Sequence, residues 1–321
     1  MPKDGQSFCG LITIFVPMKW MIAGGLANIA AVLLIAPLCE GVLRKVTARL
    51  QSRRGPPLWQ PYFDLLKLLG KEDIESGESP GMQRFVARLS LAAVLTVACL
   101  VPMGFPAPMN GAGDVILLIY LLTLCGICTL LGGLAAGSTY SLLGIGREMM
   151  TMIALEPLFA IALLIGAIHA RSFRLDKVLN GSVYDAHGIP WSGLILLVVM
   201  VLSFQAFVQR MPFDVSEAET EIMEGPLVEY SGPKLALFKS AQMARLVVHS
   251  GLFVALFVPW GSELAFPLGW LLFWAKVLAL VLLVTAVAAT HARYRIDQAI
   301  RYFAGLLAAA FAALALAGYG F

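Results

Sequence analysis

Charged side chains are scarce in this 321-residue chain: Asp, Glu, Lys and Arg make up 13% of it, whereas hydrophobic residues make up 59%. The mean hydropathy is +0.82. A soluble domain needs a polar surface, and this composition is too apolar to provide one. The composition therefore predicts a protein that lies mostly in lipid. The net charge of +3 is small and spread between apolar runs, which excludes the concentrated basic face of a nucleic-acid-binding protein.

Cysteines are also few, and four of the five lie in or at the edge of apolar runs, where thiols usually pack as small hydrophobic groups. The five are Cys9, Cys39, Cys99, Cys125 and Cys128. No disulfide framework is indicated. Cys125 and Cys128 form a Cys-x-x-Cys pair, but no second pair and no nearby His completes a set of four metal ligands. We interpret this pair as packing residues.

The sequence lacks the common motifs of catalytic chemistry. It has no dinucleotide-binding fingerprint, no phosphate-binding loop, no nucleophile in convincing context with a base, and no credible metal cluster. No internal repeat supports a transporter built from two similar halves. Residues 1–19 lack the order of a signal peptide, so the first apolar run is expected to be a retained helix. We expect no cofactor and no redox centre in this chain.

Long apolar runs are what the chain has in abundance. A helix that crosses about 30 Å of hydrocarbon needs roughly 20 mainly apolar residues. Eight runs approach this length, near residues 20–40, 85–103, 113–136, 149–170, 190–209, 241–260, 268–290 and 301–320. They predict an all-α, polytopic membrane protein, with residues 1–321 forming a single integral membrane domain of about eight transmembrane helices.

Two charged segments, residues 41–84 and 210–240, stand apart from these runs. Basic residues gather in the first segment and between the last two runs, at Arg44, Lys45, Arg49, Arg53, Arg54, Lys67, Lys71, Arg293, Arg295 and Arg301. Loops rich in Lys and Arg usually face the cytoplasm. Both segments are therefore predicted on the cytoplasmic side and both termini on the periplasmic side, although Arg171, Arg174 and Lys177 run against this trend.

The first charged segment contains an amphipathic pattern. Trp59, Phe63 and Leu66 fall at positions i, i+4 and i+7, while Asp64 and Lys67 take other faces. This spacing predicts a helix that lies at the membrane surface. A helix that rests on lipid headgroups and a helix that docks a partner both fit the pattern.

The second charged segment holds six carboxylates in sixteen residues, namely Asp214, Glu217, Glu219, Glu221, Glu224 and Glu229. Asp214 and Glu217 fit a helix N-cap and its third residue, and Gly225-Pro226 would end the helix about three turns later. On such a helix four carboxylates would share one stripe, with Glu219 on the far side. The stripe is either a solvated acidic face or one that is offset by basic partners or by protonation.

Three ionisable residues interrupt the predicted spans: Glu148, Glu156 and Lys276. A charge at the centre of a span costs about 3 kcal/mol and usually faces a polar interior. Glu148 and Glu156 would lie about 12 Å apart along one helix, so we expect the three residues to line a buried polar path. An ion pair of Glu148 with Arg147 is the alternative. Arg245 and His249 lie one turn apart in another span, and packing is the favoured interpretation of that His.

Several motifs together resemble the eight-helix membrane subunit of complex I and its homologues in formate hydrogenlyase and energy-converting NiFe hydrogenases. The resemblance spans roughly residues 30–300. The matching residues are Arg53-Arg54-Gly55-Pro56 with Asp64, Lys67 and Lys71-Glu72-Asp73; Tyr140 to Gly144 through Arg147 to Glu156; and Pro212-Phe213-Asp214, Glu217-Ala218-Glu219 and Glu229-Tyr230-Ser231-Gly232.

The details of these motifs favour the hydrogenase branch of the family. Quinone-reducing members usually have Val-Ala-Gly where this chain has Met223-Glu224-Gly225-Pro226-Leu227, and Arg147-Glu148-Met149 with Leu155-Glu156-Pro157 is similar to hydrogenase-linked members. The resemblance implies a membrane-anchoring, proton-path subunit of a NiFe hydrogenase or formate hydrogenlyase complex in a prokaryotic inner membrane. The NiFe centre and the iron–sulfur clusters would belong to hydrophilic large and small subunits, and antiporter-like subunits would be membrane partners.

The resemblance also assigns roles to residues. The proton path would use Glu148, Glu156, Lys276 and the six carboxylates of the second segment, including Glu229. Partner docking would use Arg53, Arg54, Asp64, Lys67, Lys71, Glu72 and Asp73. Two other functions remain open. A quinone-binding subunit of NADH:quinone oxidoreductase would need an apolar cavity near residues 41–72 and 210–230, and a secondary transporter would use Glu156 and Lys276 as coupling groups.

Overall fold

The computed structural model describes residues 6–74, 79–105, 107, 109, 113–184, 190–261, 264 and 267–320, without the side chains of residues 6–22, 219 and 220. Within these residues the fold is all-α, as predicted. The helices are α1 (Gln6–Leu50), α2 (Gln60–Leu69), α3 (Pro80–Leu100), α4 (Val115–Ala136), α5 (Thr139–Ala170), α6 (Leu175–Val178), α7 (Trp191–Phe207), α8 (Glu219–Ile222), α9 (Gly232–Phe257), α10 (Leu268–Thr290) and α11 (Ile296–Gly318), with 3-10 turns η1 (Ser182–Tyr184) and η2 (Gly225–Leu227).

Seven of the described helices are long and apolar enough to cross a membrane. They are α1, from Ala23 onward, α3, α4, α5, α9, α10 and α11. The eighth predicted run forms α7, which is apolar but has only 17 residues. The multi-pass membrane architecture is therefore confirmed, whereas the number of crossings stays a prediction because α7 is short.

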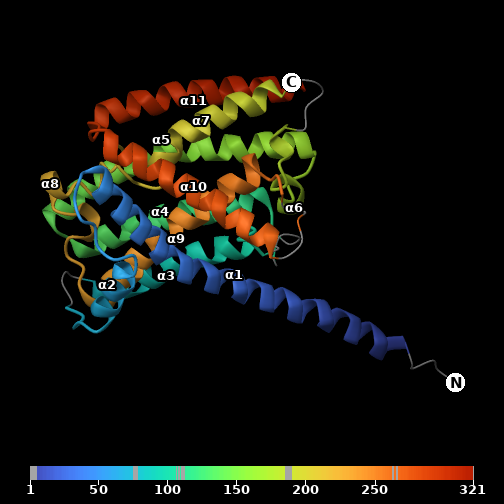
Figure 1. Ribbon diagram of the computed structural model, residues 1–321, viewed down its shortest axis with the longest axis horizontal. Coiled ribbons are helices and arrows are strands. Elements are labelled where there is room, and N and C mark those ends of the chain that lie inside the picture. The colour runs from blue at the N-terminus through green and yellow to red at the C-terminus, as the bar shows by residue number, and fades with distance from the viewer. Residues whose placement is uncertain are drawn as a thin grey trace.

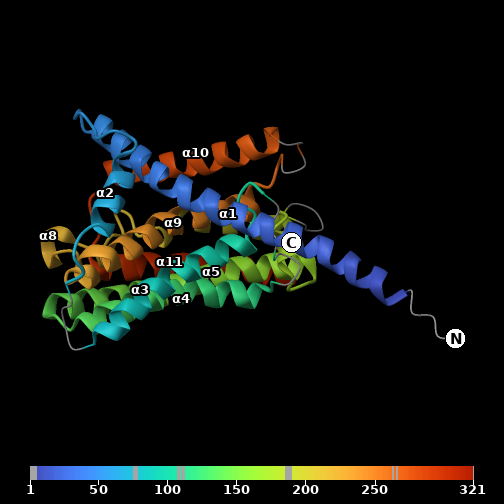
Figure 2. The ribbon, with the colours of Figure 1, turned by 90° about the horizontal axis from the view of Figure 1, so that it is seen from below.

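The long helices form one bundle, which α1 crosses obliquely (Figure 1, Figure 2), and α11 packs on α5 and α7. Helix α9 is the most buried span and contacts α1, α2, α3 and α10. Gly137, in the left-handed conformation (φ 71°), ends α4, and Ser138 caps α5 by accepting a hydrogen bond from the Ser141 amide at 3.2 Å. This tight turn lets α4 and α5 pack against each other.

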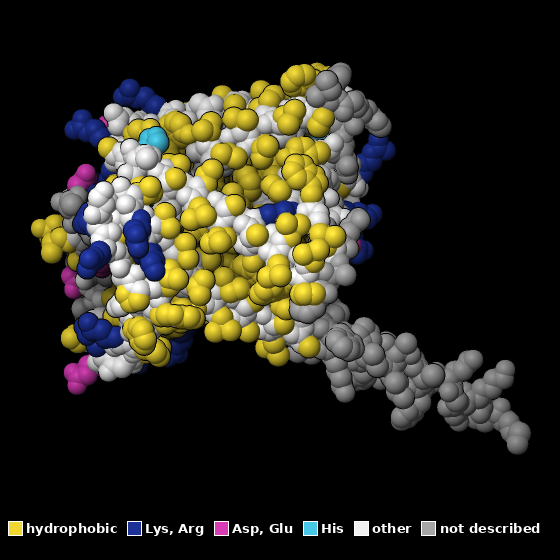
Figure 3. Space-filling view, viewed as in Figure 1, with side chains coloured by type: hydrophobic (Ala, Val, Ile, Leu, Met, Phe, Trp, Pro, Cys, Tyr) yellow, Lys and Arg dark blue, Asp and Glu magenta, His cyan; other side chains and the backbone are white. Residues whose placement is uncertain are grey.

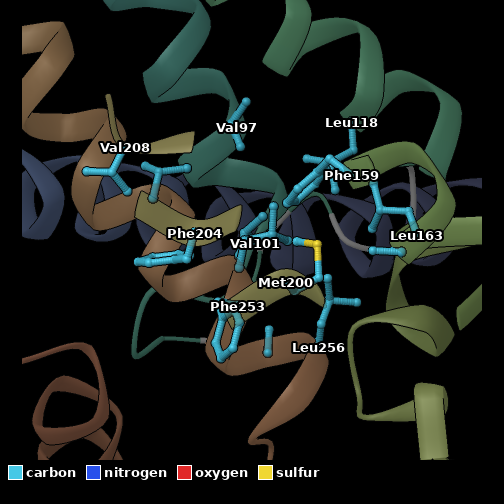
Figure 4. Close-up of a cluster of buried hydrophobic side chains, with 14 of the residues drawn as sticks. Val97, Val101, Leu118, Phe159, Leu163, Met200, Phe204, Val208, Phe253 and Leu256 are labelled. Atoms are coloured by element: carbon cyan, nitrogen blue, oxygen red, sulfur yellow. The ribbon is translucent and has the colours of Figure 1, made fainter. Parts of the chain in front are cut away.

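Apolar side chains from most of the described helices form the core, and Figure 4 shows part of it. Val97 of α3, Leu118 of α4, Phe159 of α5, Met200 of α7 and Leu256 of α9 are all nearly inaccessible. The outside of the bundle is apolar as well. Hydrophobic side chains cover the middle of the visible face, and most Lys and Arg side chains gather at its two ends (Figure 3). This surface suits a lipid environment, where apolar side chains outside the bundle cost nothing.

The predicted surface helix is present as α2, and it lies at the same end of the bundle as α8 (Figure 1, Figure 2). Trp59, Phe63 and Leu66 are all more than half exposed. Their apolar stripe therefore points away from the bundle, as the amphipathic pattern indicated.

The helix predicted from Asp214 to Glu224 was wrong. Only the four residues of α8 are helical, and Met223 and Glu224 then take left-handed conformations. Gly225 follows with φ 56°, in a place where a Cβ atom would collide with the Ser216 carbonyl oxygen. The segment folds back on itself because its carboxylates reach partners in different directions, and these tertiary contacts override the local helix signal.

Candidate functional site

The carboxylates of the acidic segment, residues 214–229, are distributed among partners on other parts of the chain. Arg293 Nη2 lies 3.1 Å from Asp214 Oδ2, Gln242 Nε2 donates to Glu217 Oε1, Arg147 Nη1 lies 2.6 Å from Glu221 Oε2, and Lys239 Nζ lies 3.9 Å from Glu224 Oε1. The structure thus favours the interpretation in which basic partners offset the acidic charge. Glu229 is exposed, and the side chain of Glu219 lies outside the described residues.

Two carboxyl groups of this segment have pKa values shifted in opposite directions. Glu217 is half-buried, and burial raises its pKa to about 7, against the charge of Lys239, which lowers it. Glu221 is exposed, and its hydrogen bond with Arg147 holds its pKa below the ordinary value. A carboxyl that titrates near neutral pH can both accept and release a proton. Glu217 is therefore suited to proton exchange, whereas Glu221 is suited to a permanent ion pair.

The sequence analysis missed a buried carboxylate, Glu40, which lies at the end of the bundle that carries α2 and the acidic segment. Glu40 of α1 is 4% exposed and accepts hydrogen bonds from Arg210 and from Arg44 Nε, the latter at 3.2 Å. Arg44 Nη1 also donates to Asp64 Oδ2 at 2.8 Å, which ties α2 to α1. The sequence held the relevant signal, because Glu40 interrupts an apolar run, but the predicted span ended on that residue.

The residues predicted to dock partners fall into two groups. Asp64 and Asp73 are bound within the chain, and Asp73 Oδ1 lies 3.1 Å from the buried Lys234 ammonium. The others are exposed: Arg53, Arg54, Lys67, Lys71 and Glu72. The first group holds α2 and its flanking segment in place, and the second group is accessible to another protein.

A cavity of about 930 Å³ lies among the end of α1, residues 53–56, the acidic segment and α9. Its wall carries many charged groups, including Glu40, Arg44, Arg53, Arg54, Arg210, Asp214, Glu217, Glu224, Lys239 and Arg245. We call it the charged cavity. It occupies the place where a quinone-binding protein would need an apolar chamber, but these charged side chains stand among the apolar ones in its lining.

A second, smaller cavity of about 90 Å³ lies between the spans and is lined by both Glu148 and Glu156. We call it the inner cavity. Glu148 is 3% exposed and accepts a hydrogen bond from Gln209 Nε2. The alternative pair of Glu148 with Arg147 is not found, because Arg147 binds Glu221. Glu156 is half-buried, and among the described residues its carboxyl has no hydrogen-bond partner.

Helix α9 contributes Arg245 and His249 to the inner cavity. Arg245 Nη1 donates to Gln209 Oε1 at 2.7 Å, so Gln209 links Arg245 to Glu148. His249 packs against the rings of Phe159 and Phe207, each with a centroid distance of 6.2 Å, and its Nδ1 lies 2.9 Å from the Arg245 carbonyl oxygen. These contacts agree with the packing interpretation of His249.

Lys276 does not join the two carboxylates, contrary to the prediction. Its ammonium donates to the carbonyl oxygens of Val258, at 2.7 Å, and of Trp260. These carbonyls follow the end of α9 that is opposite to the acidic segment, and Lys276 lines a separate cavity there with Asp176 and Asn180. The ammonium is stabilised because it satisfies backbone groups at a helix end. Cys125 and Cys128 are both buried in α4, within packed clusters.

Comparison with known proteins identifies the family of this fold. A family model described as NADH dehydrogenase matches residues 24–318. Hydrogenase-4 component C of Escherichia coli is 36% identical over 79% of this chain and 80% of its own length, and formate hydrogenlyase subunit 4 of the same organism is 34% identical over 82% and 88%. An NADH-quinone oxidoreductase subunit of Anaplasma phagocytophilum is 30% identical over 87% and 90%.

A solved structure has the same fold. It belongs to the membrane-bound sulfane sulfur reductase, an archaeal respiratory membrane complex, and matches with a TM-score of 0.83 and 24% identity, covering 92% of this chain and 99% of that one. The family model covers nearly the whole described bundle. This chain therefore belongs to the NADH dehydrogenase family of proteins.

Proposed function

We propose that this chain is the membrane-anchoring and proton-path subunit of a membrane-bound NiFe hydrogenase or formate hydrogenlyase complex. The observation that carries the proposal is the inner cavity, in which Glu148 and Glu156 line one space inside the bundle. The similarity to hydrogenase-4 component C and formate hydrogenlyase subunit 4 supports the same function. The electron-transfer cofactors, a NiFe centre and iron–sulfur clusters, belong to hydrophilic partner subunits.

The end of the bundle that carries α2 and α8 is the cytoplasmic docking side in this proposal. Exposed Arg53, Arg54, Lys67, Lys71 and Glu72 gather there and suit a charged protein partner. The first turns of α1 and the last turns of α11 point to the other end (Figure 1). Both termini are then periplasmic in an inner membrane, with antiporter-like subunits beside the bundle. A cysteine placed in the acidic segment should react with reagents from the cytoplasmic side only.

Proton movement follows from the groups that line the two cavities. Glu217, with a pKa of about 7, exchanges protons with water in the charged cavity. Glu148 takes up a proton next, and the inner cavity leads from Glu148 to Glu156. A water molecule occupies about 30 Å³ of liquid, so the inner cavity has room for about three molecules. Such a chain is enough to join two carboxyl groups that lie about two helical turns apart.

The test is the substitution Glu156→Gln in the complex purified with its native partners. Gln has nearly the same size but cannot take up a proton, so the complex should assemble and reduce a soluble dye with hydrogen at the wild-type rate. In sealed vesicles it should lose ion translocation. Glu156→Asp is the matched control, because it keeps a titratable carboxyl and should retain part of the gradient. A wild-type gradient in the Gln variant would reject the proton role of Glu156.

The quinone-binding function is the second candidate, and the relative from Anaplasma phagocytophilum favours it. The lining of the charged cavity argues against it, because an apolar ring would displace water from many charged groups without compensation. Hydrogen-dependent reduction of a short-chain quinone by the purified complex would support this candidate. Hydrogen oxidation with soluble dyes alone is the result we expect.

A further inference from the structure

The charged cavity and the inner cavity share a wall. Gln209 and Arg245 line both, whereas Glu148 lines only the inner cavity and Glu217 only the charged one. The hydrogen bond of 2.7 Å from Arg245 to Gln209 therefore stands between the two spaces. A reagent that crosses this shared wall meets the pair.

The orientation of the Gln209 amide is dictated by its two partners. A guanidinium group only donates hydrogen bonds, and an ionised carboxylate only accepts them. The carbonyl oxygen of Gln209 therefore faces Arg245, and its NH₂ group faces Glu148. A rotation of the amide by half a turn would place like dipoles against both charges. Because both bonds involve a charged partner, each is about twice as strong as a neutral one.

The backbone at Gln209 is also held in an uncommon conformation. Its φ of 54° lies in the left-handed region, which few non-glycine residues occupy. The amides of Gln209 and Arg210 donate to Ala206 and Gln205 carbonyl oxygens at 3.0 and 3.1 Å, and these bonds end α7. Residues held in such conformations cluster at sites where the surrounding structure fixes a functional geometry.

Arg245 supplies the independent sign that this wall is built for a polar occupant. The residue is 9% exposed, and its Nε atom is buried without a hydrogen-bond partner in the part of the chain that the structure describes. A buried donor without a partner is costly unless water or another acceptor reaches it. The inner cavity, which Arg245 lines, has room for such water.

We propose that Gln209 is a partition between the two cavities and a positioning residue for Glu148, closed while Glu148 is ionised and released when Glu148 accepts a proton. Protonation changes a charge-assisted bond into a neutral one, so the amide loses about half of its attraction to Glu148. The proton comes from the Glu217 carboxyl, which lines the charged cavity, and moves to the Glu148 carboxylate, so that Glu217 becomes ionised and Glu148 becomes neutral. The proposal deepens the proton-path function and rests on it only for the direction of proton flow.

Several charged and titratable groups surround Glu148. They are Arg147 and Glu156 on α5, Arg210 after α7, Glu217 in the acidic segment, and Arg245 and His249 on α9, with the uncharged amide of Gln209 among them. Arg147 is engaged by Glu221 and Arg210 by Glu40. Among the described residues, Gln209 is the side chain with a hydrogen bond to the Glu148 carboxylate.

A cysteine reporter in the inner cavity tests the partition. Thr151 lines the inner cavity but not the charged one and is 8% exposed. Its hydroxyl donates to the Glu148 carbonyl oxygen in its own helix. Thr151→Cys is thus a mild substitution. The reagent is a small cationic methanethiosulfonate, applied to the purified complex, and the rate is corrected for the parent complex without the reporter.

Gln209→Leu is the main test variant, because Leu has a similar volume but no hydrogen-bonding group. It should raise the labelling rate roughly tenfold or more, since it removes two bonds to charged groups. Gln209→Asn keeps an amide and tolerates the left-handed backbone, so it should stay closer to wild type. Glu148→Gln mimics the protonated state and should be labelled faster than the parent but more slowly than the Leu variant, because it keeps the bond between Arg245 and Gln209. Equal labelling in all four proteins would overturn the partition.

The same experiment separates this proposal from the proton-path function. Labelling needs neither hydrogen nor a proton gradient. If Glu156→Gln abolishes the gradient while Gln209→Leu leaves labelling unchanged, only the partition is rejected. If Glu156→Gln keeps the gradient while labelling responds as described, the partition stands and the proton role of Glu156 is rejected.

Discussion

The two ends of the bundle use charge differently. At the end with α2 and α8, ion pairs join residues far apart in the chain: Glu40 and Arg210 are 170 positions apart, and Arg147 and Glu221 are 74 apart. At the other end, Arg174 pairs with Asp176, two positions away. Ion pairs therefore hold different segments together at the first end, whereas at the second end the ion pair is local and the Lys276 ammonium binds backbone carbonyls instead of a carboxylate. A membrane protein places such costly long-range pairs where its polar chemistry takes place.

The largest expected effect tests the long-range pairs. Glu40→Ala would leave Arg44 and Arg210 close together without the carboxylate between them, and breaking a buried pair costs about 3 kcal/mol when its other partners are partly exposed. We expect a large loss of assembled complex and a lower thermal unfolding midpoint in detergent.

Glu40→Gln is the matched control, because it keeps the volume and one acceptor oxygen. It should lose less stability than the Ala variant. If Glu40→Ala unfolded at the wild-type temperature, charge would not hold the helices together at this end.

A smaller effect is expected at Glu217, and it depends on pH. Its pKa rises from 4.5 to about 7 on folding, so the folded protein binds more protons than the unfolded chain between these values. Stability contributed by this group falls as pH rises from 4.5 to 7, and the full cost of the buried charge is present above 7. Glu217→Gln should therefore stabilise the protein on the order of 1 kcal/mol at pH 8.

The gain from Glu217→Gln should shrink toward pH 5, where the native carboxyl is already protonated. Thermal unfolding of wild type and variant at pH 5, 6, 7 and 8 would show this trend. A constant difference across that range would mean that Glu217 does not titrate there.

The smallest effect is expected at the opposite end. Asp176→Asn removes an exposed, local ion pair with Arg174, and such pairs contribute little. Unfolding temperature and complex yield should match wild type. A loss as large as that of Glu40→Ala would abolish the distinction between the two ends.

Much of the fold was predictable from the sequence. Apolar runs are a strong signal because lipid demands about 20 residues of one character, and each predicted run contains a helix. The spacing of Trp59, Phe63 and Leu66 was enough to predict α2, because their exposed stripe is a local property. The pairing of Glu148 and Glu156 in one cavity also followed from their positions on a single helix.

The rest depended on contacts between distant segments. The acidic segment has the spacing of a capped helix, but Arg147, Lys239 and Arg293 draw its carboxylates apart. Lys276 interrupts an apolar run just as Glu156 does, yet it satisfies carbonyls at a helix end. No local pattern distinguishes these two cases, because the carbonyls that bind Lys276 follow another helix and the cavity that Glu156 lines is formed by several helices.

The pair formed by Glu40 and Arg210 has a consequence for the order in which the protein is made. Chains are synthesised at about 5 to 20 residues per second, so Arg210 emerges roughly ten to thirty seconds after Glu40. During that interval α1 has to enter the membrane while the Glu40 carboxyl can pair with Arg44 of its own helix but not yet with Arg210. Its position near the end of the apolar run lets Glu40 wait at the water interface, and the bundle can close around it only after α7 has been inserted.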